Sequence, residues 1–420
     1  MRKNRFFGLV SSLIALLVVA GCASPATPTP DASPTPVDDA PATTPGEPVS
    51  PPAAGEPIRI GLYGPLTGPV AFLGEGFDMG IRLAIEDLGG EIEGHPIQYV
   101  SADNRANPTD AVNAVSRLMD VDQVHAIIGG GASSATIGAL PIIAEGQTPA
   151  VSATSTNPFI YDMIGVGGNE WAFRINPDDL IMARGYAEYI HEQGVNRISL
   201  VAENTDFGRG AMNAYKPIFN DLGVAIATED YFDLGTSDFR PALTSMRGAN
   251  PDAVLIVMTE NDCATFMRQY REVGIEADVY SRGACTSPLF LELTADDPSI
   301  AEGIVEFSFF YGLQDPELAE RFLARWGTPI TGHRMGGYYA MYYTLAPAIQ
   351  AVIQSGNEIT RENIRDALED LNVETPAGLI SFDEHNQAYT NGVLTVNRDG
   401  QVQLLEILEL GPVDHSILQQ

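Results

Sequence analysis

The feature that most constrains the fold is a regular alternation of short apolar runs with amphipathic stretches. Residues such as Ala111, Val115 and Leu118 recur at the three- to four-residue spacing typical of helices. Near-continuous apolar strands separated by helices predict an α/β fold with parallel sheets covered on both faces and right-handed βαβ connections. The strand-like runs are Ile58–Tyr63, Ile97–Ala102, Ala126–Ile128, Ala150–Ala153, Ile198–Ala202, Val224–Phe232, Ala253–Met258 and Val279–Ser281.

The alternation occurs in two sets, one before Ile175 and one from Ile198 on. Between them, the segment 176–179 offers an N-cap and a first-turn acid for a helix that starts near Leu180. The chain beyond Ile58 is too long for one ordinary core and suits two lobes of about 150 residues each. We therefore expect two doubly wound lobes.

The later part of the chain predicts a return to each lobe. Helical patterns cover Pro316–Trp326, Met335–Ile353 and Arg361–Leu371, and β-like segments follow at Leu379–Phe382, Val393–Val396 and Val402–Ile407. The predicted boundaries are 58–175 plus 308–379 for lobe I, and 176–307 plus 380–410 for lobe II.

The N-terminus indicates export. A cationic head (Arg2, Lys3 and Arg5) precedes an apolar run that ends in Ala20-Gly21-Cys22, which predicts a signal peptide over 1–21. The run is shorter than the ~20 apolar residues that span a bilayer. A cysteine after Ala-Gly resembles the bacterial lipobox, so Cys22 is the predicted lipid attachment site. The alternative is an ordinary signal peptide with an incidental cysteine.

Residues 22–57 form a second region of distinct composition. Beyond Cys22 they are almost entirely Pro, Ala, Thr, Ser, Gly and acidic residues, which cannot bury enough apolar surface to fold. We expect a disordered tether that holds the folded part away from the membrane, although a plain disordered tail has the same composition. The predicted location is the cell envelope, outside the cytoplasm and anchored by lipid.

The charge balance excludes some partners. The formal net charge is -32, and the predicted signal peptide carries three basic and no acidic residues, so its removal gives -35. This argues against nucleic acid and against adhesion to anionic lipid, because both need a basic surface.

Two cysteines remain besides Cys22. Cys263 and Cys285 form an even pair in an oxidising compartment and follow neighbouring predicted strands, so a disulfide is plausible. Two free buried thiols are the alternative.

Two polar loops lie where a parallel sheet binds ligands, beyond the carboxyl ends of its strands. Gly129–Thr136 combines glycines with a helix start, which suits an anion. Ser152–Pro158 is a second hydroxyl-rich loop. We expect the hydroxyl and amide groups of both loops to grip a carboxylate, and the candidate ligand-binding residues here are Ser133, Ser134, Thr154 and Thr156. A phosphate also fits physically, but the P-loop lysine is absent. The alternative is helix capping at Ser133 or Ser134 and a turn at Asn157.

Two segments of the second set could face the same crevice. Asn204–Gly208 and Glu260–Cys263 each follow a predicted strand. Asp206 or Glu260 could receive an ammonium or guanidinium group, and Phe207 could cover it by cation–π contact. The alternative for Glu260 and Asp262 is N-capping of the next helix.

Signals of catalysis and of metal binding are weak. The sequence has no G-x-S-x-G, H-E-x-x-H or Cys-x-x-Cys motif, and its six histidines are scattered. We expect no enzyme activity, metal or cofactor.

Several of these segments resemble the leucine/isoleucine/valine-binding protein family, in the family's order. They are Ile58–Gly76, Gly89–Asp103, Val124–Gly130, Val201–Gly210 and Gly378–Asp383. The resemblance implies a type I periplasmic-binding fold with two lobes joined by three crossovers. It also implies a monomer that closes on a small amino-acid-like ligand and delivers it to an ABC permease in the membrane. Phe72, within the first segment, becomes a further candidate contact.

Position by position, the resemblance implies roles for lobe I residues. Ser133 matches the serine that receives the ligand carboxylate. Thr154 matches the residue whose carbonyl takes the ammonium, and Thr156 the threonine that binds both groups.

The second lobe departs from the family. Phe207 and Glu260 stand where tyrosines are usual, and the ammonium-binding acid would fall at Gly283 or Ala284. These departures favour a polar or cationic amino acid, or an amide, with Glu260 or Asp206 supplying negative charge. Two other functions share such a scaffold: a ligand sensor for a membrane receptor, and a hydrolase or transferase.

Overall fold

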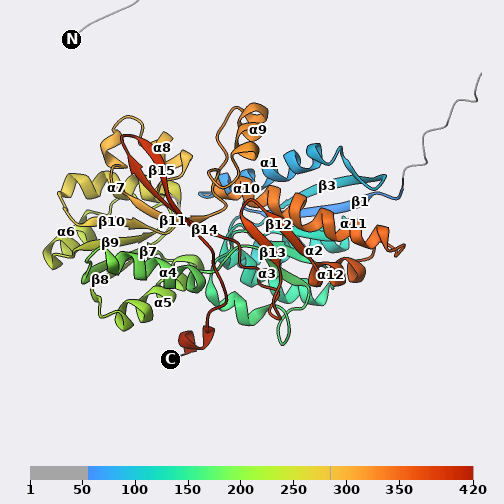
Figure 1. Ribbon diagram of the computed structural model, residues 1–420, viewed down its shortest axis with the longest axis horizontal. Coiled ribbons are helices and arrows are strands. Elements are labelled where there is room, and N and C mark those ends of the chain that lie inside the picture. The colour runs from blue at the N-terminus through green and yellow to red at the C-terminus, as the bar shows by residue number, and fades with distance from the viewer. Residues whose placement is uncertain (1–54, 284, 420) are drawn as a thin grey trace, which may run out of the picture. The chain divides into compact units, whose positions relative to one another are not determined.

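The computed structural model describes residues 55–283 and 285–419. The predicted signal peptide, the predicted lipid site at Cys22 and nearly all of the predicted tether lie outside the described residues. Within this described part, no helix has the length and apolar character needed to cross a bilayer. Two separate sheets, each flanked by helices, form the two lobes (Figure 1).

Lobe I contains a six-stranded sheet in the order β2-β3-β1-β4-β5-β6. All its neighbours pair in parallel except the short β2, which is antiparallel to β3. The strands are β1 (Ile58–Gly64), β2 (Glu91–Ile92), β3 (His95–Asp103), β4 (Ala126–Gly129), β5 (Ala150–Ser152) and β6 (Ala172–Arg174). The helices are α1 (Ala71–Asp87), α2 (Pro108–Asp120), α3 (Ser133–Glu145) and the 3-10 helix η1 (Pro158–Met163).

Lobe II contains a seven-stranded sheet in the order β15-β14-β11-β10-β9-β7-β8. Its first five strands in sequence pair in parallel, and an antiparallel hairpin closes one edge. The strands are β7 (Arg197–Glu203), β8 (Ala225–Phe232), β9 (Ala253–Val257), β10 (Asp278–Ser281), β11 (Val305–Phe309), β14 (Gly392–Arg398) and β15 (Gln401–Leu408). The helices are α4 (Asp179–Glu192), α5 (Asp206–Asp221), α6 (Arg240–Ala249), α7 (Glu260–Val273), α8 (Pro288–Leu293) and η2 (Pro298–Ile300).

Between β11 and β14 the chain returns to lobe I. This part comprises α9 (Pro316–Trp326), α10 (Gly332–Tyr339), the π-helical turn η3 (Ala340–Leu345), α11 (Ala346–Gln354), α12 (Arg361–Glu369) and the hairpin β12 (Asn372–Thr375) and β13 (Gly378–Ser381). Helix α10 lies against α1 because glycines let the two backbones approach. A Cβ atom on Gly80 would be 1.9 Å from the carbonyl oxygen of Arg334. A last 3-10 helix, η4 (His415–Gln419), ends the described chain.

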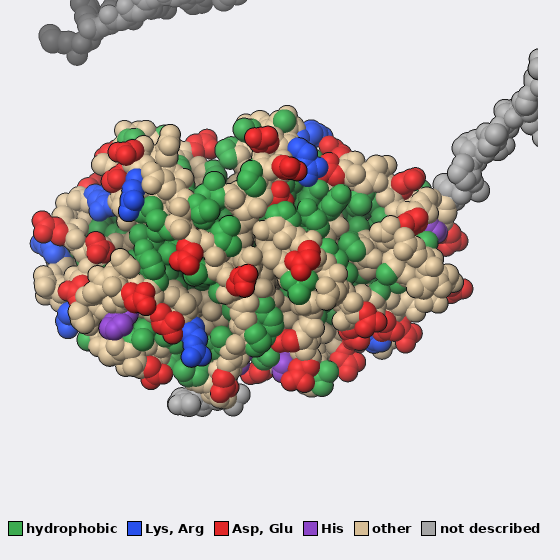
Figure 2. All heavy atoms as spheres, viewed as in Figure 1, with side chains coloured by type: hydrophobic (Ala, Val, Ile, Leu, Met, Phe, Trp, Pro, Cys, Tyr) green, Lys and Arg blue, Asp and Glu red, His purple; other side chains and the backbone are tan. Residues whose placement is uncertain are grey.

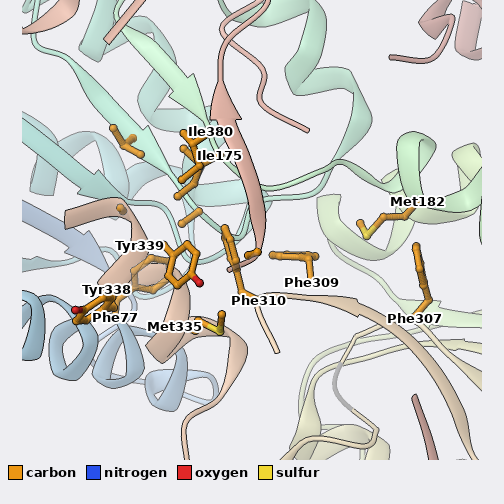
Figure 3. Packing of buried hydrophobic residues seen from close by; sticks show 14 of the residues in the cluster. Phe77, Ile175, Met182, Phe307, Phe309, Phe310, Met335, Tyr338, Tyr339 and Ile380 are labelled. Atoms are coloured by element: carbon orange, nitrogen blue, oxygen red, sulfur yellow. The ribbon is translucent and has the colours of Figure 1, made fainter. Parts of the chain in front are cut away.

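The core continues from one lobe to the other. Phe309 and Phe310 lie between the lobe I residues Tyr338 and Tyr339 and the lobe II residue Phe307 (Figure 3). The ring centroids of Phe310 and Tyr339 are 5.1 Å apart, within the range of favourable aromatic pairs. The crossover that leaves β11 is therefore built into the core.

The predicted fold class is confirmed, but four strands were missed. All eleven predicted strand segments occur, whereas β2, β6, β11 and β12 had no prediction. β6 is only three residues long, and β11 reads Val-Glu-Phe-Ser-Phe, in which Glu306 and Ser308 interrupt the apolar run. The predicted helix Met335–Ile353 is divided by the π-helical turn η3. The predicted lobe boundaries stay predictions, because membership of a sheet does not fix where a lobe ends.

The surface reflects the acidic composition. Aspartate and glutamate side chains are spread over the face shown in Figure 2, where lysine and arginine are fewer.

Candidate functional site

A cleft of about 1050 Å³, including its part open to solvent, lies at the carboxyl ends of strands from both sheets. Six of the eight predicted ligand-binding residues line it: Ser133, Ser134, Thr154, Thr156, Phe207 and Glu260. Parallel sheets bind ligands at this edge, because the loops that follow the strands are free to carry polar groups. The structure therefore brings together loops that the sequence suggested separately.

The lobe I wall begins with the glycine turn after β4. Gly129, Gly130 and Gly131 have φ angles of 146°, 96° and 70°, which favour glycine. A Cβ atom on Gly129 would lie 2.1 Å from the carbonyl oxygen of Tyr63. The turn leads into α3, whose N-cap is Ala132 and whose start has no side-chain cap. Neither Ser133 nor Ser134 is the N-cap, so the first-turn N–H groups of α3 remain available to an anion.

The hydroxyl groups of this wall are buried and sparsely bonded. Ser133 Oγ accepts a hydrogen bond of 3.3 Å from the main-chain N–H of Asn157. Thr154 Oγ1 and Thr156 Oγ1 have no well-aligned partner among the described residues. By contrast, Ser155 Oγ is paired with Thr136 Oγ1 at 2.6 Å. Because a buried polar group without a partner is costly, the two threonine hydroxyls are suited to receive a ligand.

The lobe II wall carries three buried carboxyl groups. Glu203 ends β7, Glu260 begins α7 and Glu306 lies in β11, with exposed fractions of 4%, 2% and 1%. Glu203 Oε1 accepts a hydrogen bond of 2.6 Å from Thr259 N, and Glu306 Oε2 accepts one of 2.8 Å from Thr286 N. Glu260 Oε2 is buried without a partner among the described residues.

Burial controls the protonation of this wall. Loss of water raises the pKa of Glu203 and of Glu306 to about 7 and that of Glu260 to about 8. The neighbouring carboxyl groups of Glu306 and Glu203 add to the rise at Glu260. Near neutral pH, Glu260 is therefore mostly protonated in the ligand-free cleft.

Arg282 is the one arginine or lysine among the described residues that line the cleft. Its Nε atom lies 2.9 Å from Asp179 Oδ1, an ion-pair distance, although the two are not aligned as a hydrogen bond. The guanidinium carbon is 5.8 Å from the ring centroid of Phe207 and 5.4 Å from that of Phe309. Burial raises the pKa of Asp179 to about 6, and the charge of Arg282 opposes that rise. Arg282 is thus fixed by an acid and two aromatic faces.

The opposite rim of the cleft carries a neutral histidine. His333, in α10, lines the cleft, and burial lowers its pKa to about 4. The described residues contain no group of three or more His, Cys, Asp or Glu side chains placed to hold a metal ion. The residues present suit hydrogen bonding and ion pairing with an organic ligand.

Two predicted contacts lie outside the cleft. Phe72 is the second residue of α1, and its neighbours Val70 and Leu73 line the cleft instead. Asp206 is exposed at the first position of α5. At the start of α7, Asp262 accepts a hydrogen bond of 3.1 Å from Gly235 N, whereas the N-cap is Thr259. Asp262 therefore has a local structural contact, and Glu260 is not the helix cap.

A disulfide joins Cys263 and Cys285, whose Cα atoms are 5.9 Å apart. Cys263 lies in α7, three residues after Glu260, and Cys285 lies three residues after Arg282. The bond therefore ties together two segments of the lobe II wall.

Sequence reasoning missed three ionisable groups of this wall. Glu203 directly follows the predicted strand Ile198–Ala202, and Arg282 directly follows the predicted strand Val279–Ser281. Both could have been found by including the residues that adjoin the strand ends. Glu306 belongs to β11, where the alternation of Glu306 and Ser308 places both on the cleft side.

The sequence is similar to that of known binding proteins. The periplasmic binding protein family model matches residues 57–401. An amino acid binding protein of Pseudomonas aeruginosa is 29% identical over 292 residues, covering 69% of this chain and 74% of that protein. The leucine-, isoleucine-, valine-, threonine-, and alanine-binding protein of the same organism is 25% identical over 338 residues, covering 79% and 87%.

Solved structures share the fold. A leucine binding protein from Thermotoga maritima has 24% identity and a TM-score of 0.74, covering 84% of this chain and 99% of that one. A solute binding protein of an ABC transporter from Rhodopseudomonas palustris, in complex with benzoate, has 18% identity and a TM-score of 0.75, covering 86% and 98%. The family and these neighbours are solute-binding proteins and not enzymes. The chain belongs to the periplasmic binding protein family and is related to its leucine/isoleucine/valine-binding members.

Proposed function

We propose that this protein is the lipid-anchored solute-binding component of an ABC importer, and that it captures an amino acid or a closely related small molecule by closure of its two lobes. The single observation that carries the proposal is the cleft at the strand ends. One wall offers the uncapped start of α3 and two threonine hydroxyl groups that have no well-aligned partner among the described residues, and the other offers buried carboxyl groups. These are complementary to the carboxylate and the ammonium group of an amino acid.

The lobe I wall receives the carboxylate in this proposal. Ser133, Thr154 and Thr156 supply hydroxyl groups, and the first turn of α3 supplies N–H groups and a partial positive charge. The ligand binds this wall first, and contacts from lobe II then stabilise the closed form. No covalent step takes part.

The anchor completes the proposal. Acylation of Cys22 would hold the protein at the membrane, and the proline-rich segment up to residue 57 would space the lobes from it. Metabolic labelling with a radioactive fatty acid, compared between the natural chain and Cys22→Ser, tests the anchor. Label that persists in the variant would contradict it.

Ligand capture is tested by native mass spectrometry of gently purified protein, followed by melting curves with a panel of amino acids, amides and small carboxylates. A ligand at a hundredfold excess over its dissociation constant should stabilise the protein by ~2.7 kcal/mol. The proposal fails if no compound of these classes is retained or shifts the melting curve.

A further inference from the structure

We propose that the lobe II wall of the cleft receives a second positive charge, so that the ligand is an amino acid with a cationic side chain, and that its binding releases a proton from Glu260. This inference rests on the proposed function and names the ligand class of the same cleft. Glu203 and Glu260 form the receiving pair, and neither needs to move far, since both already line the cleft.

The first step concerns charge. Among the described residues that line the cleft, Glu203, Glu260 and Glu306 are acidic, whereas Arg282 is the one arginine or lysine. Arg282 already has Asp179 at 2.9 Å. Glu306 already accepts hydrogen bonds from Thr286 N and from Ser281 Oγ, the latter at 3.1 Å. Glu203 and Glu260 have no oppositely charged group in contact among the described residues, so these two carboxyl groups can pair with a positive group of the ligand.

The second step concerns one atom. Glu260 is 2% exposed, and its Oε2 has no partner among the described residues. A buried carboxyl oxygen without a partner is costly to retain. An ammonium or guanidinium group in the cleft would supply both the missing hydrogen bond and the missing charge.

The charged groups around Glu260 do not remove this requirement. Carboxyl groups face it from β7, through Glu203, and from β11, through Glu306, and both disfavour its ionised form. From α10, Arg334 attracts it, but this guanidinium is bonded to Thr328 Oγ1 at 3.1 Å and to the carbonyl oxygen of Pro329, and it does not line the cleft.

The other ionisable groups near Glu260 are either neutral or already paired with another group. On α7 itself, Asp262 accepts hydrogen bonds from Gly235 N. From α10, the pKa of His333 is lowered to about 4 by burial, so this histidine is neutral near pH 7. Beyond the end of β10, Arg282 is engaged with Asp179 on α4. None of these groups supplies the positive charge that Glu260 lacks.

The alternative ligand class is an anion at Arg282, whose Nη2 is also buried without a partner among the described residues. An anionic side chain there would approach Glu306 and Asp179 as well. Like charges in a buried site oppose each other strongly, so this arrangement is disfavoured. A neutral hydrogen-bond acceptor or a water molecule would satisfy Nη2 at less cost.

The proton release follows from the same contacts. In the ligand-free cleft the pKa of Glu260 is raised to about 8, so the carboxyl group is mostly neutral at pH 7. A cation in contact favours the carboxylate, and the proton leaves to the buffer as the ion pair forms. A neutral aliphatic side chain brings no positive charge and would remove water from the cleft. Both effects disfavour the ionised form of Glu260, so its proton would stay in place.

The test is isothermal titration calorimetry of the purified protein at pH 7 in phosphate and in Tris, with L-arginine, L-lysine, L-leucine and L-glutamate. We expect tightest binding by arginine or lysine, and an apparent enthalpy that depends on the buffer's ionisation enthalpy with up to about one proton released. Affinity for the cation should rise up to about tenfold per pH unit between pH 6 and 8. Tightest binding of leucine or glutamate, or an enthalpy that is the same in both buffers, overturns the inference.

Two variants sharpen the test. Glu260→Gln keeps the shape of the side chain and should lower affinity for the cationic amino acid at least tenfold and abolish the proton release. Glu276→Gln removes an exposed carboxyl group from the same lobe and should change neither. Leucine binding without proton release would preserve the proposed function and overturn the ligand class, whereas no binding by any compound in a broad panel would overturn both.

Discussion

The side-chain amide of Asn157 donates a hydrogen bond to the main-chain carbonyl oxygen of Asp206. The main-chain N–H of Asp206 in turn donates a long hydrogen bond of 3.4 Å to Ser134 Oγ. Asn157 and Ser134 belong to lobe I, and Asp206 begins α5 in lobe II. Asp206 therefore connects the lobes beside the cleft through its backbone, and its carboxylate is not needed for that contact.

Asn157→Ala should weaken ligand binding, because the two lobes lose this hydrogen bond beside the cleft and are then held around a ligand by fewer contacts. A loss of about 0.5–1.5 kcal/mol is expected, mainly as faster dissociation. Stopped-flow fluorescence with the identified ligand measures the rate. The variant also loses the contact of Asn157 Oδ1 with Phe159 N, so Thr360→Ala, which removes a helix cap at Asn363 N elsewhere in lobe I, is the control. Equal dissociation rates for Asn157→Ala and the natural chain would show that the contact does not stabilise closure.

Thr154→Val and Thr156→Val should each lower affinity by ~1–3 kcal/mol with little loss of stability in the ligand-free protein. The reason is that neither hydroxyl group has a well-aligned partner among the described residues, so an apolar replacement of the same shape costs the ligand-free fold little. The cost is smaller at Thr154, because the Thr156 hydroxyl is close enough to Asp179 to lower the pKa of that carboxyl group. Titration calorimetry and chemical denaturation measure the two effects.

Ser155→Ala, in the same loop, should lower stability and leave ligand affinity unchanged. Its hydroxyl pairs with Thr136 Oγ1 at 2.6 Å and does not line the cleft, so stability should fall by about 1 kcal/mol. Should both valine variants bind as tightly as the natural chain, the carboxylate site assigned to this wall would be wrong.

How far the sequence could predict this molecule differs between its parts. Eleven of the fifteen strands in the described residues follow from apolar patterns, because burial of strands leaves a strong local signal. The residues of the lobe I wall could also be predicted from the sequence, since glycines and hydroxyl residues cluster in two short loops. The residues of the lobe II wall could not be predicted in this way. Glu203, Arg282 and Glu306 come from three separate segments, and only the tertiary structure shows that they line the same cleft. Glu306 was harder still to predict, because its strand, β11, was not predicted either.

The stability of the ligand-free protein should fall as the pH rises from about 5 to 8. Burial raises the pKa of Glu203 and Glu306 to about 7 and that of Glu260 to about 8, above their values in the unfolded chain. The folded state then binds more protons than the unfolded state, so this stabilisation is full at low pH and is lost as pH passes through the folded values. Each group contributes a slope of at most ~1.4 kcal/mol per pH unit while it titrates.

Comparison with Glu260→Gln isolates one of these groups. The variant cannot ionise at this position, so its stability relative to the natural chain should increase between pH 6 and 8. Denaturant unfolding at several pH values provides the measurement. Two stability curves that stay parallel across this range would mean that Glu260 ionises as freely in the folded protein as in the unfolded chain.

Replacement of both cysteines, Cys263→Ala with Cys285→Ala, should affect stability and binding together. The disulfide closes a loop with a sequence separation of 22, for which a loss of ~3 kcal/mol is expected on chain entropy. Affinity should also fall, because the bond holds the segment after β10 beside α7, and Arg282 and Ser287 on that segment line the cleft. Unfolding in denaturant and ligand titration, each with and without a reducing agent, separate the two effects. The natural chain should approach the variant when reduced, and the variant should not respond. A reduced natural chain with unchanged affinity would show that packing alone, without the covalent bond, orders this side of the cleft.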